Sequence, residues 1–406
     1  MTTVRTVDSR RGRADLWILT AGLAVSVAGD AAAFIALLLR LQPHGSGWVA
    51  ALLAAELVPV VVLAPVVGRV VDRLETRGVL IVALLGQALV AVPLGLLDGP
   101  LPTVLLFAVL AGLAAFVRPA TSALVPAITG PVGRERGYAR LSLGFGLGWI
   151  AGPAAGGLLT GWLGVRAAVL ADAATFAVLA GACALLTVRR RPDPSAAAGD
   201  RSGGLRLLLA DRVLAVAVVG VAVSIGAAVV DNVAAPFRFV DQLGASSAQY
   251  GMYLTVWGAG ALVGSQLLPL LRLSHRVAVA VACLAMGAGI AGIGVAPGLL
   301  VAYAAAAAGG VGNGILNVAQ NALITARTPA ERHGRLFATV GAVNQTAIGG
   351  GTAAAAPLVA WLGGGGALVT AGLTAMAVAA VVLLVTTGVA EPTGSDPGVP
   401  STAEAV

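Results

Sequence analysis

Lysine is absent from this sequence of 406 residues, and charged residues of all kinds make up only 11% of it. Soluble globular domains carry about 25% charged residues, so this composition excludes an ordinary soluble fold. The two cysteines, Cys183 and Cys283, both lie in apolar stretches, which excludes a disulfide framework. The three histidines, His44, His275 and His333, fall in loops or at helix ends, and no loop carries carboxylates paired for metal binding. We therefore expect no metal, no other cofactor and no enzymatic centre.

Hydrophobic residues fill the sequence instead, at 58%, and the mean hydropathy is +0.94. A helix needs about 20 apolar residues to cross a bilayer. The stretches that reach this length are 16–40, 48–67, 79–97, 103–125, 138–161, 166–188, 212–234, 248–270, 276–296, 299–325, 335–361 and 366–389. The first is too long for the core of a signal peptide and is expected to remain as an anchor. The pattern predicts an all-α membrane protein with twelve transmembrane helices.

The arginines divide unequally between the two sides of such a chain. With the N-terminus placed in the cytoplasm, the inner segments hold 22 arginines and the outer segments hold only Arg40, Arg166 and Arg238. Cytoplasmic loops of membrane proteins are enriched in basic residues. This rule predicts a multi-pass protein of the cell (plasma) membrane with both termini in the cytoplasm. It also accounts for the net charge of +7 without a nucleic-acid partner.

One long polar segment, residues 189–211, is rich in Pro, Gly, Ser and Arg and is expected to be a cytoplasmic linker. It separates an N-terminal half, 15–188, from a C-terminal half, 212–390, each with six helices. The tails at 1–14 and 391–406 are polar and are expected to be disordered and cytoplasmic.

The two halves resemble each other at an offset near 197 residues, since Gly137 then falls on Gly334 and Gly152 falls on Gly349. Internal duplication of this kind is typical of transporters, in which the substrate path runs between the two repeats.

A polar stretch, Gly68-Arg69-Val70-Val71-Asp72-Arg73-Leu74-Glu75-Thr76-Arg77, separates the second and third apolar segments. Its charges must lie at a water-facing end, and its arginines place that end in the cytoplasm. The stretch resembles the Gly-x-x-x-Asp-Arg signature between the second and third helices of the major facilitator superfamily. Gly68, Asp72 and Arg73 match, and Arg77 fits the trailing basic position, although the usual intervening glycine is missing. The resemblance implies two pseudo-symmetric six-helix halves and an inner gate that Asp72 and Arg73 latch.

The fifth apolar stretch contains a second motif, Gly148-x-x-x-Gly152-Pro153-x-x-Gly156-Gly157. Small residues four positions apart leave one helix face almost bare, so another helix can approach closely. Pro153 lacks a backbone donor and is expected to kink or loosen the helix. A general packing seam would explain the same glycines, because the sequence has 55 of them. The motif also resembles the one that marks the drug-exporting antiporters of the superfamily, which implies a close hinge between helices.

Three shorter patterns are similar to those of the macrolide and siderophore exporters of that superfamily. They are Gly29-Asp30 followed by Ala36-Leu37, Pro59-x5-Pro65-x2-Gly68, and Pro119-x3-Ala123-x2-Pro126. The likeness covers most of residues 16–390. It departs from the group near the start of the fifth helix, where Tyr138-Ala139-Arg140 replaces the usual Ala-Asn pair.

Ionisable groups inside transmembrane helices are candidates for function. Asp30 lies about 21 Å, and Glu56 about 18 Å, from the cytoplasmic ends of their helices at 1.5 Å per residue. Two acids at similar depth could share a proton or bind a cationic compound, and unrelated acids near the outer mouth are the alternative. Arg118 is expected either to pair with a carboxylate or to extend toward the interface. Asp172 and Asp231 lie nearer the outer helix ends, where solvated or capping roles are expected.

The tenth stretch carries three asparagines at four-residue spacing, Asn313, Asn317 and Asn321, which fall on one helix face. Amides are costly in lipid, so this face is expected either to line a cavity or to hydrogen-bond another helix. Asn344 and Gln345 of the eleventh stretch are candidates to join it.

These features predict a monomeric secondary transporter that exports a small, mostly apolar compound by proton antiport. Asp30, Glu56 and Arg118 are the predicted proton-coupling residues. Expected partners are the substrate, protons and the lipid bilayer. A proton-coupled uptake symporter and a metabolite or siderophore exporter are alternatives within transport. A membrane-embedded lipid-modifying enzyme is the alternative from a different class, and a sensor without transport is a third.

Overall fold

The computed structural model describes residues 9–188, 204–271, 273–329 and 332–386, and it contains helices and no strands in those ranges. The elements in chain order are α1 (Ser9–Leu41), η1 (Gln42–His44), α2 (Ser46–Arg73), α3 (Thr76–Leu96), α4 (Pro100–Leu185), α5 (Gly204–Ala210), α6 (Arg212–Pro236), η2 (Phe237–Gln242), α7 (Ser247–Leu271), α8 (His275–Val295), α9 (Leu299–Arg327) and α10 (His333–Thr386).

Glycines with a left-handed backbone divide two of these helices. The breaks lie at Gly130 (φ 68°) and Gly164 (φ 82°) in α4 and at Gly363 (φ 68°) in α10. Glycine adopts positive φ without the steric cost that other residues meet. The resulting rods are named here span 4 (Pro100–Gly130), span 5 (136–163), span 6 (165–185), span 11 (333–362) and span 12 (364–385).

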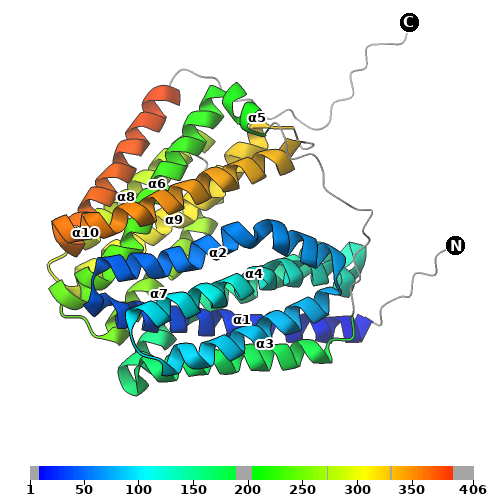
Figure 1. Ribbon diagram of the computed structural model, residues 1–406. Helices are drawn as coiled ribbons and strands as arrows, with labels where there is room; N and C mark the ends of the chain where they lie inside the picture. The colour runs from blue at the N-terminus through cyan, green and yellow to red at the C-terminus, as the bar shows by residue number, and fades with distance from the viewer. Residues whose placement is uncertain (1–8, 189–203, 272, 330–331, 387–406) are drawn as a thin grey trace, which may run out of the picture.

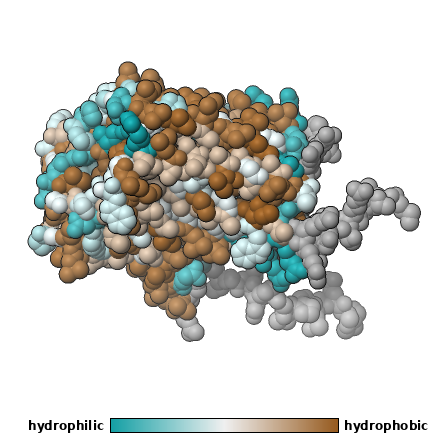
Figure 2. Space-filling view, turned by 90° about the horizontal axis from the view of Figure 1, so that it is seen from below, coloured by the Kyte–Doolittle hydropathy of each residue, from teal (hydrophilic) through white to brown (hydrophobic). Residues whose placement is uncertain are grey.

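Among the described residues, nine helices are long and apolar enough to cross a membrane. Two of the nine contain the breaks at Gly164 and Gly363, and α7, with 25 residues, supplies a further rod. Twelve spanning rods result, which confirms the predicted all-α architecture. In the view of Figure 2, apolar residues cover the middle of the molecule and hydrophilic residues gather toward its two ends, as a bilayer requires.

Several predicted boundaries were wrong because helices extend into polar sequence at the membrane surface. α1 begins at Ser9, although the first span was predicted from 16. The predicted polar turn at 68–77 is largely helical, since α2 continues to Arg73 and α3 starts at Thr76. Part of the predicted linker also forms a helix, α5. The remainder of the linker, 189–203, and the predicted tails at 1–8 and 391–406 lie outside the described residues.

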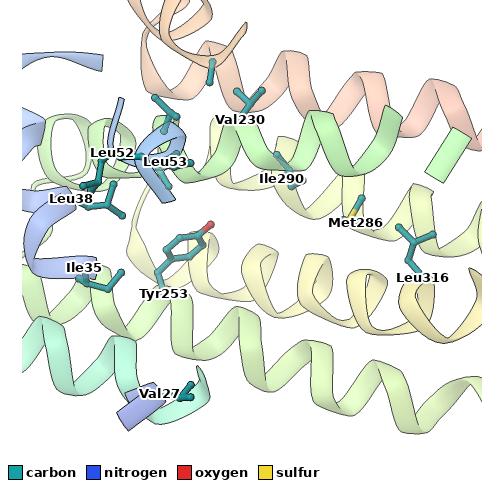
Figure 3. Packing of buried hydrophobic residues seen from close by; sticks show 14 of the residues in the cluster. Val27, Ile35, Leu38, Leu52, Leu53, Val230, Tyr253, Met286, Ile290 and Leu316 are labelled. Carbon is teal, nitrogen blue, oxygen red and sulfur yellow. The ribbon is translucent and has the colours of Figure 1, made fainter. Parts of the chain in front are cut away.

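Helices α1 to α4 form one bundle and α6 to α10 form the other, side by side in Figure 1. Apolar side chains fill both bundles, and Figure 3 shows Leu38 and Leu52 of the first with Ile290 and Leu316 of the second. Between the bundles, α2 contacts span 11, and span 5 contacts α7.

Two arginines at equivalent positions of the two halves make the same kind of contact. The Arg40 guanidinium donates to the carbonyl oxygens of Leu94 (3.0 Å) and Leu97 (3.1 Å), at the end of α3. Arg238 donates to Ile293 (3.2 Å) and to Ala296, at the end of α8. Positive groups stabilise helix C-termini. The two arginines are 198 positions apart (238 minus 40), close to the predicted offset of 197.

The halves touch at one end and separate at the other. At the end that carries η1 and η2, Gln42 Nε2 donates to Asp241 Oδ1 (2.6 Å), and Ser46 Oγ donates to the Ala356 carbonyl (3.1 Å). At the end that carries α5, here named the linker side, a β-carbon added at Gly68 or at Gly341 would meet nothing within 4 Å. The ribbon diagram shows α2 and α10 diverging toward the linker side (Figure 1). The conformation is therefore closed at one end and open toward the linker side.

An ion pair joins α6 to the end of α9 on the linker side. Arg327 Nε donates to Asp211 Oδ2 (2.7 Å), while Asp211 Oδ1 caps α6 by accepting from Val213 N (2.9 Å) and Leu214 N (3.1 Å). Partial burial of this carboxylate acts to raise its pKa, but the hydrogen bonds from Arg327 and the two backbone groups together hold the pKa of Asp211 below its ordinary value.

Because the pKa is lowered in the folded state, the pair stabilises the protein above the unfolded pKa of about 4 and loses its effect as pH falls below it. The Asp211→Asn substitution keeps a capping oxygen and removes the charge. It should lower the thermal unfolding temperature at pH 7 by an amount that corresponds to roughly 1 kcal/mol or less, since the pair is partly exposed. The difference from wild type should shrink as pH falls below about 4 in a thermal-shift assay, and a pH-independent difference would contradict this reading. Asp98→Asn, at an 83% exposed carboxylate, is the matched control.

Candidate functional site

A cavity of about 500 Å³ lies in the first bundle and is lined by residues of α1, α2, α3 and spans 4 to 6. We name it the carboxylate cavity. Most of its wall is apolar, with Phe34, Phe107 and Trp149 as the large side chains. The ionisable residues that line it are Asp30, Glu56, Arg118 and Asp172. The structure thus brings all three predicted coupling residues together and adds a fourth.

Asp30 and Asp172 meet where α1 and span 6 pack closely. A β-carbon added at Gly29 would lie 2.5 Å from Asp172 Oδ1, so only a glycine leaves room for that carboxylate beside Asp30. Thr175 Oγ1 donates to Asp172 Oδ1 (3.2 Å) and holds it in place. The predicted solvated or capping role of Asp172 was wrong, because this residue is only 2% exposed.

The depth of Asp172 could have been found from the sequence. Asp172 comes eight residues after Gly164 (172 minus 164), about 12 Å along span 6, and Asp30 comes 11 residues before Leu41 (41 minus 30), about 17 Å along α1. α1 ends and span 6 begins at the same side of the bundle, so these lengths place the two acids at comparable depths.

Glu56 connects the carboxylate cavity to a second cavity of about 320 Å³, which lies between the two halves. We name this second space the inter-half cavity. Its polar residues are Glu56 of α2, Asn232 of α6, and Gln345 and Thr352 of span 11. Glu56 therefore faces both the acidic first half and the neutral, amide-bearing second half.

Asp30, Glu56 and Asp172 all line this mostly apolar cavity, so charges on them would act on one another. Like charges in a poorly solvated space repel strongly, so the three carboxylates favour taking up protons or a cation. In the part of the chain that the structure describes, no three His, Cys, Asp or Glu side chains are arranged to hold a metal ion.

Arg118 does not form the predicted ion pair among the described residues. Its guanidinium carbon instead lies 5.2 Å from the ring centroid of Phe145 in span 5, which is a cation–π contact. The arginine still lines the same cavity as the three acids, so it places a positive charge on their side of the bundle.

The predicted inner-gate residues lie at the open, linker-side end of α2. Gly68, Asp72 and Arg73 are all exposed there. Arg77, which fits the trailing basic position of the motif, donates its guanidinium N–H groups to the carbonyl oxygens of Ala184 (2.6 Å) and Leu186. Those bonds tie the start of α3 to the end of span 6 within the same half.

The glycine motif of span 5 packs against two other helices. Gly148, Gly152 and Gly156 face α1: a β-carbon added at Gly152 would lie 2.6 Å from the Ala31 Cβ, and one at Gly156 would lie 2.5 Å from the Ala32 Cα. Gly157 faces α7 instead and packs against the Ser247 carbonyl. The motif therefore holds span 5 against α1 of its own half and against α7 of the other.

Pro153 lies within span 5, where its backbone angles stay helical, and the predicted kink or loosening of the helix there stays a prediction. Within α4, residues with non-helical backbone angles occur at Gly130 and Gly164. The carbonyl group of Pro153 packs directly against Gly251 of α7. A β-carbon at Gly251 would collide with that carbonyl. The close approach of span 5 to α7 at this point therefore depends on Gly251 of α7.

The predicted amides divide between two roles. Asn317 is exposed, and its Nδ2 donates to Asn313 Oδ1 (2.8 Å) on the same helix, while Asn321 is also exposed. Asn344 Nδ2 donates across helices to Gln320 Oε1 (3.4 Å). Gln345 lines the inter-half cavity.

Asp231 lies apart from these cavities, in an aromatic cluster of the second half. Tyr253 donates its hydroxyl to Asp231 Oδ2, and the Tyr253 ring stacks on Phe239 with centroids 4.5 Å apart. The predicted solvated or capping role was wrong here too, because Asp231 is only 6% exposed.

Comparisons with known proteins agree with this architecture. The sequence profile described as Major Facilitator Superfamily matches residues 16–230. No curated protein sequence gives a match. The solved structure of the nucleoside transporter NupG has a TM-score of 0.76 at 12% identity, over 92% of this chain and 99% of that one. A bacterial homologue of the human lysosomal transporter Spinster, inward-facing and occupied, gives 0.72 at 13% identity, over 93% and 97%. A bacterial metal transporter gives 0.66 at 15% identity, over 92% and 98%.

Proposed function

The chain belongs to the major facilitator superfamily, and from that premise we propose that it exports a small, mostly apolar compound in exchange for protons. The superfamily and its structural neighbours indicate a transporter rather than a membrane enzyme. The export direction, the proton coupling and the substrate class are the parts that we propose.

The observation that carries the proposal is the carboxylate cavity, in which Asp30, Glu56 and Asp172 share a mostly apolar space. The apolar wall suits a hydrophobic compound. A few polar side chains in such a site fix the orientation of the bound compound. Three acids and one arginine favour a cationic or hydrogen-bond-donating substrate, and such a substrate would compete with protons for the same oxygens. Competition of this kind is what antiport requires, because the site then carries either the proton or the substrate.

We assign the proton-coupling role to Asp30, with Glu56 and Asp172 as its neighbours and Arg118 as the balancing charge. Asn313, Asn317, Asn321, Asn344 and Gln345 are the proposed polar contacts that the second half offers to the substrate. Glu56 links the two sets, since it lines both cavities.

We further propose that the linker side faces the cytoplasm of a plasma-membrane protein. The arginine distribution supports this orientation. The working unit in this proposal is one chain, with halves at 15–188 and 212–390, a cytoplasmic linker at 189–211 and cytoplasmic tails at 1–14 and 391–406. The cavity that we assign to the substrate is lined by helices of a single chain.

Transport into inverted membrane vesicles tests the proposed function. A panel of apolar cationic compounds would be offered with and without an imposed pH gradient. We expect at least one compound to accumulate only when the vesicle interior is acidic. Accumulation that ignores the gradient would remove the antiport proposal, and accumulation in right-side-out vesicles with an inward proton gradient would favour an uptake symporter.

The Asp72→Asn substitution should slow the transport cycle with little loss of substrate binding. Asp72 is exposed at the linker-side end of α2, and in the proposed closed state its charge would meet helix N-termini of the second half. Without that charge, the linker side should stay open longer. Crosslinking between cysteines introduced at Gly68 and Gly341, both of which border open space, would report the change, and an unaltered crosslinking yield would count against the latch.

A further inference from the structure

A groove outside the carboxylate cavity lies between the linker-side ends of α2 and α3, with span 4 as its floor. Its volume is about 460 Å³. Val70 and Leu74 of α2, Val79 and Val82 of α3, and Phe116 of span 4 form its apolar wall. We name this feature the lateral groove.

The lateral groove opens on the lipid-facing side of the bundle. Val82 is 70% exposed and begins a row of exposed apolar residues along α3 that continues with Leu85, Leu89 and Val92. Residues at this three- and four-residue spacing share one helix face. In a protein that crosses a bilayer, an exposed apolar helix face contacts acyl chains.

Of the described residues that line this groove, Glu75 is the charged one. Its Oε2 accepts from Gly78 N (3.1 Å) and caps α3. Its Oε1 is buried and has no hydrogen-bond partner among the residues that the structure describes. Leaving a buried carboxylate oxygen without a hydrogen-bond donor costs free energy. The described part of the protein does not supply this donor.

Neighbouring arginines do not supply that donor. Arg77 directs its guanidinium to carbonyl groups at the end of span 6, and the ion pairs of the described residues do not include Arg73. A molecule that occupies the groove could supply this donor instead.

We propose that the lateral groove is a binding site for a phospholipid with a primary amine headgroup, with its ammonium on Glu75 and one acyl chain along the apolar wall. The groove runs from Glu75 to Ala83, eight residues, which is about 12 Å at 1.5 Å per residue. One leaflet of the hydrocarbon core is about 15 Å deep, half of the usual 30 Å, so the groove matches a single chain. A primary ammonium donates hydrogen bonds to a carboxylate and a choline headgroup does not, which selects ethanolamine over choline. Only the choice of leaflet rests on the proposed orientation of the protein.

Photocrosslinking in lipid nanodiscs tests the site without any transport assay. Phosphatidylethanolamine and phosphatidylcholine with the same photoactivatable acyl chain would each be added at trace level, and labelled peptides would be mapped by mass spectrometry. Peptides that contain residues 70–83 and 113–116 should carry roughly fivefold or more label from the ethanolamine lipid, as a charge-assisted hydrogen bond would give.

The Glu75→Gln variant should bring this ratio close to one, because glutamine can still cap α3 but carries no charge. Val82→Trp, which narrows the mouth of the groove and leaves Glu75 in place, should reduce labelling by both lipids equally. Asp98→Asn should keep the wild-type ratio. Equal labelling by the two lipids in the wild type, or a preference that survives Glu75→Gln, would overturn the proposal. Either result leaves the proposed antiport untouched.

Discussion

Vesicles that contain the Asp30→Asn variant should show no substrate uptake driven by a pH gradient, while exchange of substrate for substrate continues. Asparagine has the size and hydrogen-bonding capacity of aspartate, but it cannot bind and release a proton. In the carboxylate cavity, Asp30 shares a mostly apolar space with Glu56 and Asp172. A proton taken up or lost at Asp30 therefore changes the charge that the substrate meets. Removing this one titrating group should separate substrate movement from proton movement.

Asp231→Asn is the matched control for that variant. Asp231 is also a buried acid within a transmembrane helix, but it lies in the aromatic cluster of the second half, where Tyr253 donates to it. Asparagine can accept the same hydrogen bond, so gradient-driven uptake should persist. Gradient-driven uptake at the wild-type rate by Asp30→Asn would end the assignment and move the search to Glu56.

The Gly156→Leu variant should insert into the membrane and fold but lose transport entirely, and Gly152→Leu should behave in the same way. Any β-carbon at Gly156 would lie 2.5 Å from the Ala32 Cα, so a leucine must push span 5 away from α1. Span 5 also carries Gly157, which packs on α7 of the other half. Displacing this helix should therefore disturb the contact between halves on the closed side, through which a change of access must pass.

Gly181→Leu provides the comparison, because Gly181 is exposed on span 6 and a β-carbon there meets nothing within 4 Å. Transport by this variant should match wild type, with insertion measured by fluorescence-detected size-exclusion chromatography in all three variants. Wild-type transport by Gly152→Leu and Gly156→Leu would show that transport does not need these glycines. The transport rate of Gly156→Ala should fall between those of wild type and Gly156→Leu, since alanine adds one carbon atom to the same close contact.

The sequence was sufficient to predict the fold because membrane helices satisfy two simple rules. Runs of about 20 apolar residues mark the spans, and the excess of arginine on one side fixes their alternation. Helix ends were less predictable, since α2 continues through Arg69 to Arg73 at a point where the sequence alone suggests a turn. Charged residues can extend a helix into water at the membrane surface, so polarity does not mark its end.

The candidate site was partly predictable. Asp30 and Glu56 are conspicuous in apolar sequence, and their common depth follows from the rise of a helix. Asp172 was missed because its position was judged from one helix end and not compared with that of Asp30. Contacts between distant helices could not be derived at all. Arg118 lies over Phe145, and Arg77 binds the end of span 6. Both positions depend on side-chain packing, which the spacing of residues along one helix does not encode.

The most direct test of proton antiport is to measure whether protons move when the substrate moves. Purified protein would be placed in proteoliposomes that enclose a pH-sensitive dye, and a transported compound would be added outside without any imposed gradient. Antiport predicts that entry of the compound drives protons out, so the interior becomes more alkaline, and that Asp30→Asn liposomes show no change. An interior that becomes acidic, or one that stays constant while labelled compound enters the wild-type liposomes, would contradict proton antiport.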